Sequence, residues 1–204
     1  MKPWDRFFKE KMTLLLSEKR SVVDIGGGLR ISNKKGNRYD KEREWMLPLL
    51  TGIKYVILDT VPDYKPDIVG DIQALPLEDN SQEAIVCLAV LESVPDPFKA
   101  CEEMYRVLEV GGYCFVYLPF LYYYHAEKNY YKDYWRFSKD ALPVLFKNFS
   151  NMEIMAIRGA LGTLVRLSPL GRFKFIENCA YFLDRITGKL TSNQVSGYYI
   201  FLKK

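Results

Sequence analysis

The chain has 204 residues, of which 49% are hydrophobic and 26% charged, and these values suit one globular domain with a sizeable core. The net charge of +4 is small and its 29 basic and 25 acidic residues are spread along the chain, which argues against a nucleic-acid-binding protein. No segment approaches the roughly 20 apolar residues that cross a bilayer, and residues 1–20 lack the apolar core of a signal peptide, so we expect a cytoplasmic protein.

Predicted strands and helices alternate along the chain. We expect strands, in chain order, at 21–25, 54–58, 67–69, 83–88, 113–118, 152–158 and 198–203. We expect helices at 4–18, 39–50, 96–108, 139–147 and 172–187. Pro48 should end or kink the second helix, and Gly111 with Gly112 should end the third. This alternation is typical of an α/β protein whose mostly parallel sheet has helices on both faces.

The four cysteines are Cys87, Cys101, Cys114 and Cys179. They form no C-x-x-C pair, and three of them lie inside apolar runs. We therefore expect buried free thiols and no metal site.

The predicted strand at 21–25 runs into three glycines, Gly26 to Gly28. Glycines let the backbone turn tightly and approach a ligand, and ligands of open α/β sheets bind at the carboxyl ends of the strands. Asp24, two residues before the first glycine, is badly placed for a pyrophosphate and well placed to attract an ammonium group. The dinucleotide spacing G-x-G-x-x-G would also need a glycine where Ile31 stands. The electrostatics therefore favour S-adenosylmethionine over NAD.

Two more carboxylates follow successive strands: Asp59 comes after the strand at 54–58, and Asp71 after the strand at 67–69. Asp59 can accept both ribose hydroxyls of an adenosine, a role that dinucleotide enzymes share. Asp71 would accept from the adenine amino group, and Ile72 would provide an apolar contact for the ring. Because three acids occur in register at successive strand ends, unrelated solvated loop residues explain them poorly.

The segments VVDIGGG and YVILDT and the run from Asp67 to Pro119 resemble the core of class I S-adenosylmethionine-dependent methyltransferases, type 11. The resemblance covers about residues 20–145 and is greatest for a bacterial and archaeal subgroup often found beside glycan-biosynthesis genes. It implies a Rossmann-like sheet of seven strands, the last one antiparallel. It also implies a single domain over 1–204, with a cofactor-binding core at about 20–119 and an acceptor lid at about 120–145.

The resemblance implies S-adenosylmethionine as the cofactor. The implied contacts are Asp24, Gly26, Gly28, Asp59, Asp71, Ile72 and Leu88. The chain departs from the family pattern at Arg30 in place of a third glycine, at Glu83 in place of an aspartate, and at Ser93 in place of a histidine. Arg30 would alter the mouth of the cofactor pocket or contact the cofactor's carboxylate.

The aromatic segment 120–137 resembles the subgroup's H-x-x-P-x-D-[YF]-x-R-[FY]-[ST] pattern, with an insertion and without the proline. The matching residues are His125, Asp133, Tyr134, Arg136, Phe137 and Ser138. In this fold the loop after the fifth strand lies over the methyl group, so the segment should wall the acceptor pocket. Glu92, which follows the fourth strand, should point into the same pocket.

His125 is the only histidine in the chain. It is either the general base for a hydroxyl acceptor or a residue that holds the loop through hydrogen bonds. Asp133 and Arg136 are expected to form an ion pair that fixes the loop. Tyr124 and the neighbouring tyrosines would stack on a sugar or aromatic acceptor, or pack against one another in the lid.

These patterns predict methyl transfer from S-adenosylmethionine to a small-molecule or glycan acceptor, at oxygen. One alternative is a catalytically silent S-adenosylmethionine-binding subunit that regulates a partner. A nucleic-acid methyltransferase is the other, although Leu88 to Leu91 stand where such enzymes carry N/D-P-P-Y/F. The segment 172–187 combines aromatic and basic residues, and we expect it to pack on the core, with peripheral membrane contact as the alternative.

Overall fold

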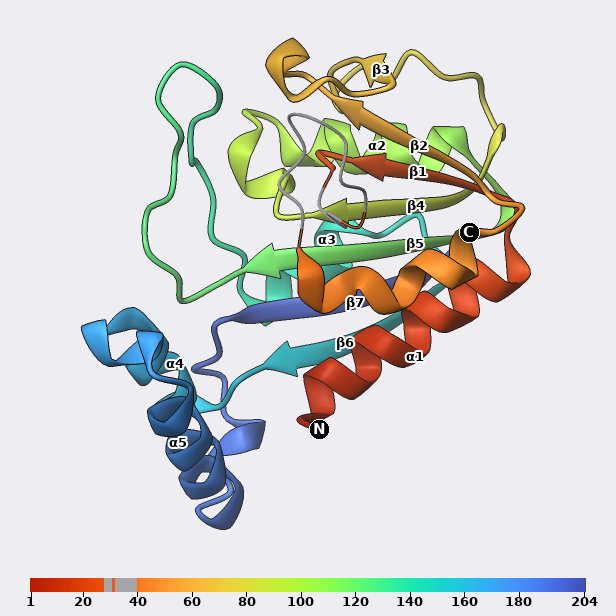
Figure 1. Ribbon diagram of the computed structural model, residues 1–204. Helices are drawn as coiled ribbons and strands as arrows, with labels where there is room; N and C mark the ends of the chain where they lie inside the picture. The colour runs from red at the N-terminus through yellow and green to blue at the C-terminus, as the bar shows by residue number, and fades with distance from the viewer. Residues whose placement is uncertain (28–30, 32–39) are drawn as a thin grey trace.

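The computed structural model describes residues 1–27, 31 and 40–204. The predictions for Gly28 and Arg30 therefore lie outside the described residues. The strands of the described chain are β1 (Ser21–Ile25), β2 (Lys54–Asp59), β3 (Ile68–Val69), β4 (Gln82–Leu88), β5 (Leu108–Pro119), β6 (Asn151–Ile157) and β7 (Gly197–Lys203). They form one sheet in the order β3-β2-β1-β4-β5-β7-β6 (Figure 1).

The direction of the strands matches the Rossmann-like prediction. β1 pairs in parallel with β2 and with β4, and the outer pairs β2–β3 and β4–β5 are parallel too. β7 lies between β5 and β6 and runs antiparallel to both. The expected mostly parallel sheet with an antiparallel last strand is therefore confirmed.

Both faces of the sheet are covered, because alternate residues of each strand point to opposite sides. Val22 packs with α1 (Pro3–Glu18) and with η1 (Lys41–Leu50), a 3-10 helix. Val23 packs on the other side with α2 (Pro97–Val107) and with α3 (Leu142–Leu145). Figure 1 shows these layers, with the carboxyl ends of β1, β4 and β5 at one edge of the sheet.

Several predicted boundaries were wrong. Pro48 does not end η1, because Leu49 and Leu50 continue it and pack on the core. The predicted helix at 139–147 is a single 3-10 turn, η4 (Lys139–Ala141), followed by the four-residue α3.

The glycine pair at 111–112 does not end α2, which stops at Val107. The glycines belong to β5, where the pairing with β4 jumps from Gln82↔Leu108 to Ala84↔Tyr113. Gly111 takes a φ of +80°, which suits this local excursion of the strand.

A helical hairpin stands beyond the carboxyl end of β6 (Figure 1). It consists of α4 (Ala160–Leu167), the 3-10 turn η5 (Pro169–Arg172) and α5 (Lys174–Ile186), and the turn η6 (Lys189–Thr191) follows it. The sequence did not predict α4. The expectation that 172–187 packs on the core holds for one face only: Ala180 and Asp184 are buried, whereas Phe175 is 78% and Ile186 is 62% exposed. Within the described chain, no helix combines the length and apolarity that crossing a membrane requires.

The cysteine prediction was correct for three positions. Cys87, Cys101 and Cys114 are buried free thiols, whereas Cys179 lies on α5 and is exposed. Burial raises the pKa of the Cys87 thiol well above its ordinary value. These buried thiols therefore act as small apolar core residues.

Candidate cofactor and acceptor site

The turn after β1 brings the backbone close to the segment after β4. The Gly26 N–H donates to the Leu58 carbonyl of β2 at 2.7 Å. Gly26 has a φ of +76°, and a Cβ placed there would lie 2.5 Å from Cγ2 of Val90. Because both the backbone conformation and the space exclude a side chain, this position requires glycine.

Asp24 is fully buried at the end of β1 and accepts a hydrogen bond from the Tyr55 hydroxyl of β2. Burial is the main cause that raises the pKa of Tyr55, and the Asp24 carboxylate raises it further. Tyr55 therefore remains a hydrogen-bond donor. The sequence analysis missed Tyr55. Strand parity could have found it, because Tyr55 pairs with Val22 and Asp24 is two residues further along the same face of β1.

Asp59 is the last residue of β2 and Asp71 follows β3, at the same edge of the sheet. Oδ1 of Asp59 accepts from the Val61 N–H at 2.9 Å, which orients the carboxylate within the turn. Asp71 is exposed, and its oxygens accept from the backbone N–H and the side-chain amide of Gln73. Its neighbour Ile72 is only 4% exposed and belongs to the core.

A pocket of about 810 Å³ lies beside these strand ends. It is lined by Thr60, Asp71 and Gln73 with the segment 93–95, and by a second wall that consists of Tyr124, the segment 126–132 and Tyr134. This volume falls within the range of small-molecule sites. The second wall contributes four tyrosines, which are Tyr124, Tyr130, Tyr131 and Tyr134. Among the predicted site residues, Asp71 and Tyr124 line this pocket, whereas Leu88 is buried at the end of β4.

His125 lies between two carboxylates. Its Nε2 is 3.4 Å from Oε1 of Glu92, which sits on the 3-10 turn η3 (Leu91–Ser93), and its Nδ1 is 3.2 Å from Oδ2 of Asp133. The side chain of Glu92 is fully buried, and its oxygens have no hydrogen-bond partner among the described residues. The Glu92 carboxylate is the main cause that raises the pKa of His125 above 6.5, while partial burial opposes it. Burial raises the pKa of Glu92.

The expected ion pair between Asp133 and Arg136 is present and has two parallel bonds. Nη1 and Nη2 of Arg136 donate to Oδ1 and Oδ2 of Asp133 at 2.5 and 2.6 Å. Nη2 also donates to the Tyr123 carbonyl at 2.8 Å, and Oδ2 of Asp133 accepts from the backbone N–H of His125 at 2.9 Å. The pair thus joins the two ends of the 123–136 segment.

The same segment is fastened to η3 through the backbone of Glu92. The Glu92 carbonyl accepts from the backbone N–H of Tyr134 at 2.7 Å and of Trp135 at 3.1 Å. The Trp135 indole N–H donates to the Val94 carbonyl at 2.9 Å. Glu92 therefore touches the segment with both its side chain and its backbone, although neither Glu92 nor His125 is among the residues that line the 810 Å³ pocket.

The fold of this chain is similar to that of known methyltransferase structures. The chain matches the structure of an S-adenosylmethionine-dependent methyltransferase from Archaeoglobus fulgidus, with a TM-score of 0.59 at 16% identity. The match covers 98% of this chain and 93% of the other protein. The fold is that of S-adenosylmethionine-dependent methyltransferases. Residues 54–116 also match the family model for a methyltransferase domain. No curated protein sequence matches the chain.

Two further structures share the fold. One is an S-adenosylmethionine-dependent methyltransferase from Methanosarcina mazei, with a TM-score of 0.52 at 13% identity over 100% of this chain and 98% of that one. The other is phosphoethanolamine N-methyltransferase 2 from Haemonchus contortus, in complex with S-adenosylmethionine. It matches 96% of this chain and 52% of its own length, with a TM-score of 0.54 at 11% identity.

Proposed function

We propose that the protein is an S-adenosylmethionine-dependent methyltransferase that acts on an oxygen atom of a small-molecule or glycan acceptor. The observation that carries the proposal is the meeting of the Gly26 turn with Asp24, Asp59 and Asp71 at one edge of a methyltransferase-fold sheet. The domain match over residues 54–116 supports it independently.

The residues at the strand ends fit this cofactor. A carboxylate two residues before the first glycine favours a cationic group over a phosphate, and Asp24 supplies it. Asp59 is half-buried and already oriented by the Val61 N–H, as a carboxylate that receives two ribose hydroxyls should be. Asp71 lies at the wall of the pocket and can accept a hydrogen bond from an adenine amino group when the Gln73 amide no longer donates to it. The cofactor supplies a methyl group already activated as a sulfonium.

The acceptor pocket lies, in this proposal, between the strand ends and the lid at about 120–145, all within one domain. Tyrosine rings offer flat apolar faces with polar tips, which suits a sugar ring that has alternating C–H and hydroxyl groups. The lid also contributes Glu127, Asn129 and two lysines to the wall, so hydroxyl groups would find hydrogen-bond partners. This combination supports a glycan or a similar polar molecule.

The lid contacts support a positioning role for His125. Because Glu92 and Asp133 stabilise its imidazolium form, they raise the pKa of His125 and make the neutral imidazole that a general base needs less available. Its ring contacts the two carboxylates rather than the pocket. We infer that Glu92, His125, Asp133 and Arg136 hold the lid over the acceptor, and that alignment and exclusion of water supply most of the rate.

The proposal is tested by incubating the protein with S-adenosylmethionine carrying a labelled methyl group and with fractionated cell extract. Mass spectrometry should find a polar small molecule or glycan that gains one methyl group on oxygen. The Asp59→Ala variant is the matched control and should lose most of the transfer. Cofactor binding without transfer to any fraction would identify a silent binding subunit, and label in RNA or DNA would overturn the acceptor class.

A further inference from the structure

The outer face of α5 is apolar and exposed. Phe175, Phe182 and Ile186 are 78%, 59% and 62% exposed. Their spacing of seven and four residues places them on one side of the helix. A face of this kind would normally be buried in a folded domain, and nothing in the described chain covers it.

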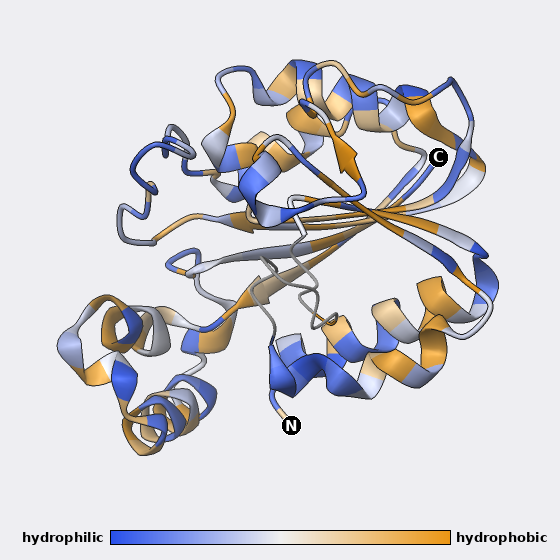
Figure 2. Ribbon diagram, turned by 45° about the horizontal axis from the view of Figure 1, so that its top comes forward, coloured by the Kyte–Doolittle hydropathy of each residue, from blue (hydrophilic) through white to orange (hydrophobic). Residues whose placement is uncertain are grey.

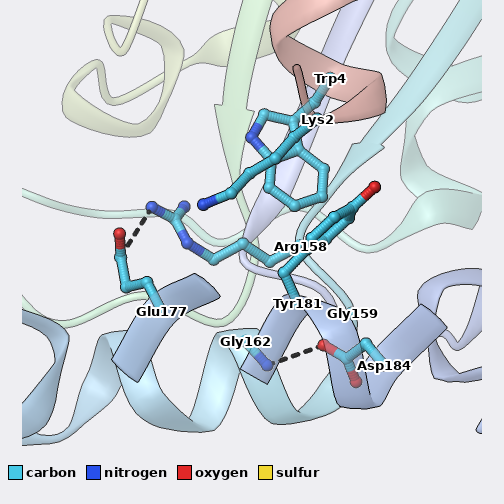
Figure 3. Close-up of a pocket in the computed structure, with 8 residues that line it drawn as sticks. All are labelled: Lys2, Trp4, Arg158, Gly159, Gly162, Glu177, Tyr181 and Asp184. Atoms are coloured by element: carbon cyan, nitrogen blue, oxygen red, sulfur yellow. Dashed lines mark hydrogen bonds and ion pairs between the residues drawn. The ribbon is translucent and has the colours of Figure 1, made fainter. Parts of the chain in front are cut away.

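The opposite face of α5 fixes the helix to the rest of the protein (Figure 3). Asp184 is fully buried and accepts from the Gly162 N–H at the start of α4 at 2.8 Å. Tyr181 packs edge-on against Trp4 of α1, with ring centroids 5.6 Å apart. Glu177, one turn earlier, is on the same face. Because this inner face is anchored, the phenylalanines cannot turn inward without breaking these contacts.

The apolar surface extends beyond α5. Leu164 and Leu167 of α4 are 66% and 45% exposed, and Leu170 of η5 is 48% exposed. Figure 2 shows hydrophobic residues on both helices of the hairpin, which stands apart from the sheet. The exposed apolar residues of the hairpin are thus Leu164, Leu167, Leu170, Phe173, Phe175, Phe182, Leu183 and Ile186.

The exposed charges of the hairpin and of the turn η6 are all basic. They are Arg172, Lys174, Arg185 and Lys189. The two acids of the segment 160–191 are not available: Glu177 pairs with Arg158 at 3.3 Å, and Asp184 is buried. Lys174 pairs with Glu42, but the two side chains are 87% and 80% exposed, and such pairs are weak.

We propose that the α4–α5 hairpin docks on an anionic lipid surface. Exposed aromatic and aliphatic residues beside basic ones are the pattern of helices that lie in a membrane interface. A second copy of the chain fits worse, because a two-fold contact through this face would bring the basic residues of both copies into one interface. The inference is independent of the proposed methyl transfer.

Vesicle co-sedimentation tests the proposal on the full chain. The protein should bind vesicles of equal parts phosphatidylcholine and phosphatidylglycerol, and bind pure phosphatidylcholine vesicles far more weakly. Phe175→Ser with Phe182→Ser should weaken binding by about tenfold or more, because two apolar side chains no longer leave water. Lys174→Ala and Arg185→Ala should each weaken it by about fivefold, and added salt should reproduce that loss.

The matched control is Phe98→Ser, because Phe98 of α2 is 51% exposed and lies outside the hairpin. It should leave vesicle binding unchanged, and circular dichroism should show that all variants fold. The proposal is overturned if the parent does not sediment with anionic vesicles, or if the hairpin variants and the control lose binding equally. It is also overturned if sedimentation velocity shows a dimer that the hairpin variants dissociate while vesicle binding persists.

Discussion

Nε2 of His125 lies 3.4 Å from Oε1 of Glu92, a carboxylate that is fully buried beneath the lid. With Asp133 on the other side of the ring, this contact stabilises the imidazolium and raises the pKa of His125 above 6.5. His125 is the only histidine, so an NMR titration of its ring protons reports this pKa directly. Glu92→Gln and Asp133→Asn should each lower it. A parent value at or below 6.5 would contradict the arrangement.

The same contact links stability to pH. A histidine whose pKa is raised on folding stabilises the protein below the unfolded value of about 6.5, and this contribution is lost as pH rises through the folded pKa. The free energy of unfolding should therefore fall from about pH 6 to pH 9 more steeply in the parent than in His125→Gln. Urea denaturation of both proteins at several pH values measures the difference. Parallel curves would show that His125 gains no proton affinity on folding.

The bidentate pair of Asp133 and Arg136 should act on the lid rather than on the cofactor site. Arg136→Ala leaves a buried carboxylate without its partner and removes a donor from the Tyr123 carbonyl. We expect a loss of about 1–3 kcal/mol in lid stability, seen as faster amide hydrogen exchange in 120–137. Lys132→Ala, an exposed lid position, is the control and should change neither. Unchanged exchange in Arg136→Ala would show that the Asp133–Arg136 pair does not hold the lid.

Gly26 and Gly111 have the same backbone conformation, so alanine variants at the two positions separate the cost of backbone strain from the cost of side-chain crowding. Gly26 and Gly111 have φ of +76° and +80°, but only at Gly26 would a Cβ meet another side chain, Val90. Each alanine variant should lose about 1–2 kcal/mol of stability from the left-handed backbone. Gly26→Ala should lose a further 1–3 kcal/mol or so from overpacking, which Val90→Ala should partly restore. Equal losses at both glycines in chemical denaturation would contradict the close contact.

The sheet could be predicted from the sequence because its strands are short β-branched runs ending at turn residues. SVVDI and KYVIL predicted β1 and β2 to within one residue. Of the two helices near the far end of the chain, α5 was predicted at 172–187, whereas α4 was not, because it is only eight residues long and contains Gly162. Local pattern also suggested a core position for 172–187. Its apolar face is real, but which surface it meets depends on tertiary contacts such as Tyr181 with Trp4.

The residues of the candidate site also differ in whether the sequence could predict their contacts. Asp24, Asp59 and Asp71 could be grouped because strand ends of a parallel sheet meet at one edge. The Asp133–Arg136 pair could be predicted because its two residues are only three positions apart in sequence. The contact of His125 with Glu92 joins residues 33 positions apart in sequence, across a turn and a lid whose path no pattern reveals. The sequence therefore left two roles open for His125, a general base at the acceptor or a residue that holds the loop, and its side chain lies between two carboxylates.

The most direct test of the central claim is calorimetric titration of S-adenosylhomocysteine and of NAD into the parent, Asp59→Ala and Asp140→Ala. The account predicts that the parent binds S-adenosylhomocysteine and not NAD. Asp59→Ala should bind it about 10- to 150-fold more weakly, because hydrogen bonds to a charged group contribute about 1.5–3 kcal/mol. Asp140 is an exposed carboxylate on η4, and the Asp140→Ala variant should bind S-adenosylhomocysteine as tightly as the parent. Equal binding of NAD by the parent, or undiminished binding by Asp59→Ala, would contradict the account.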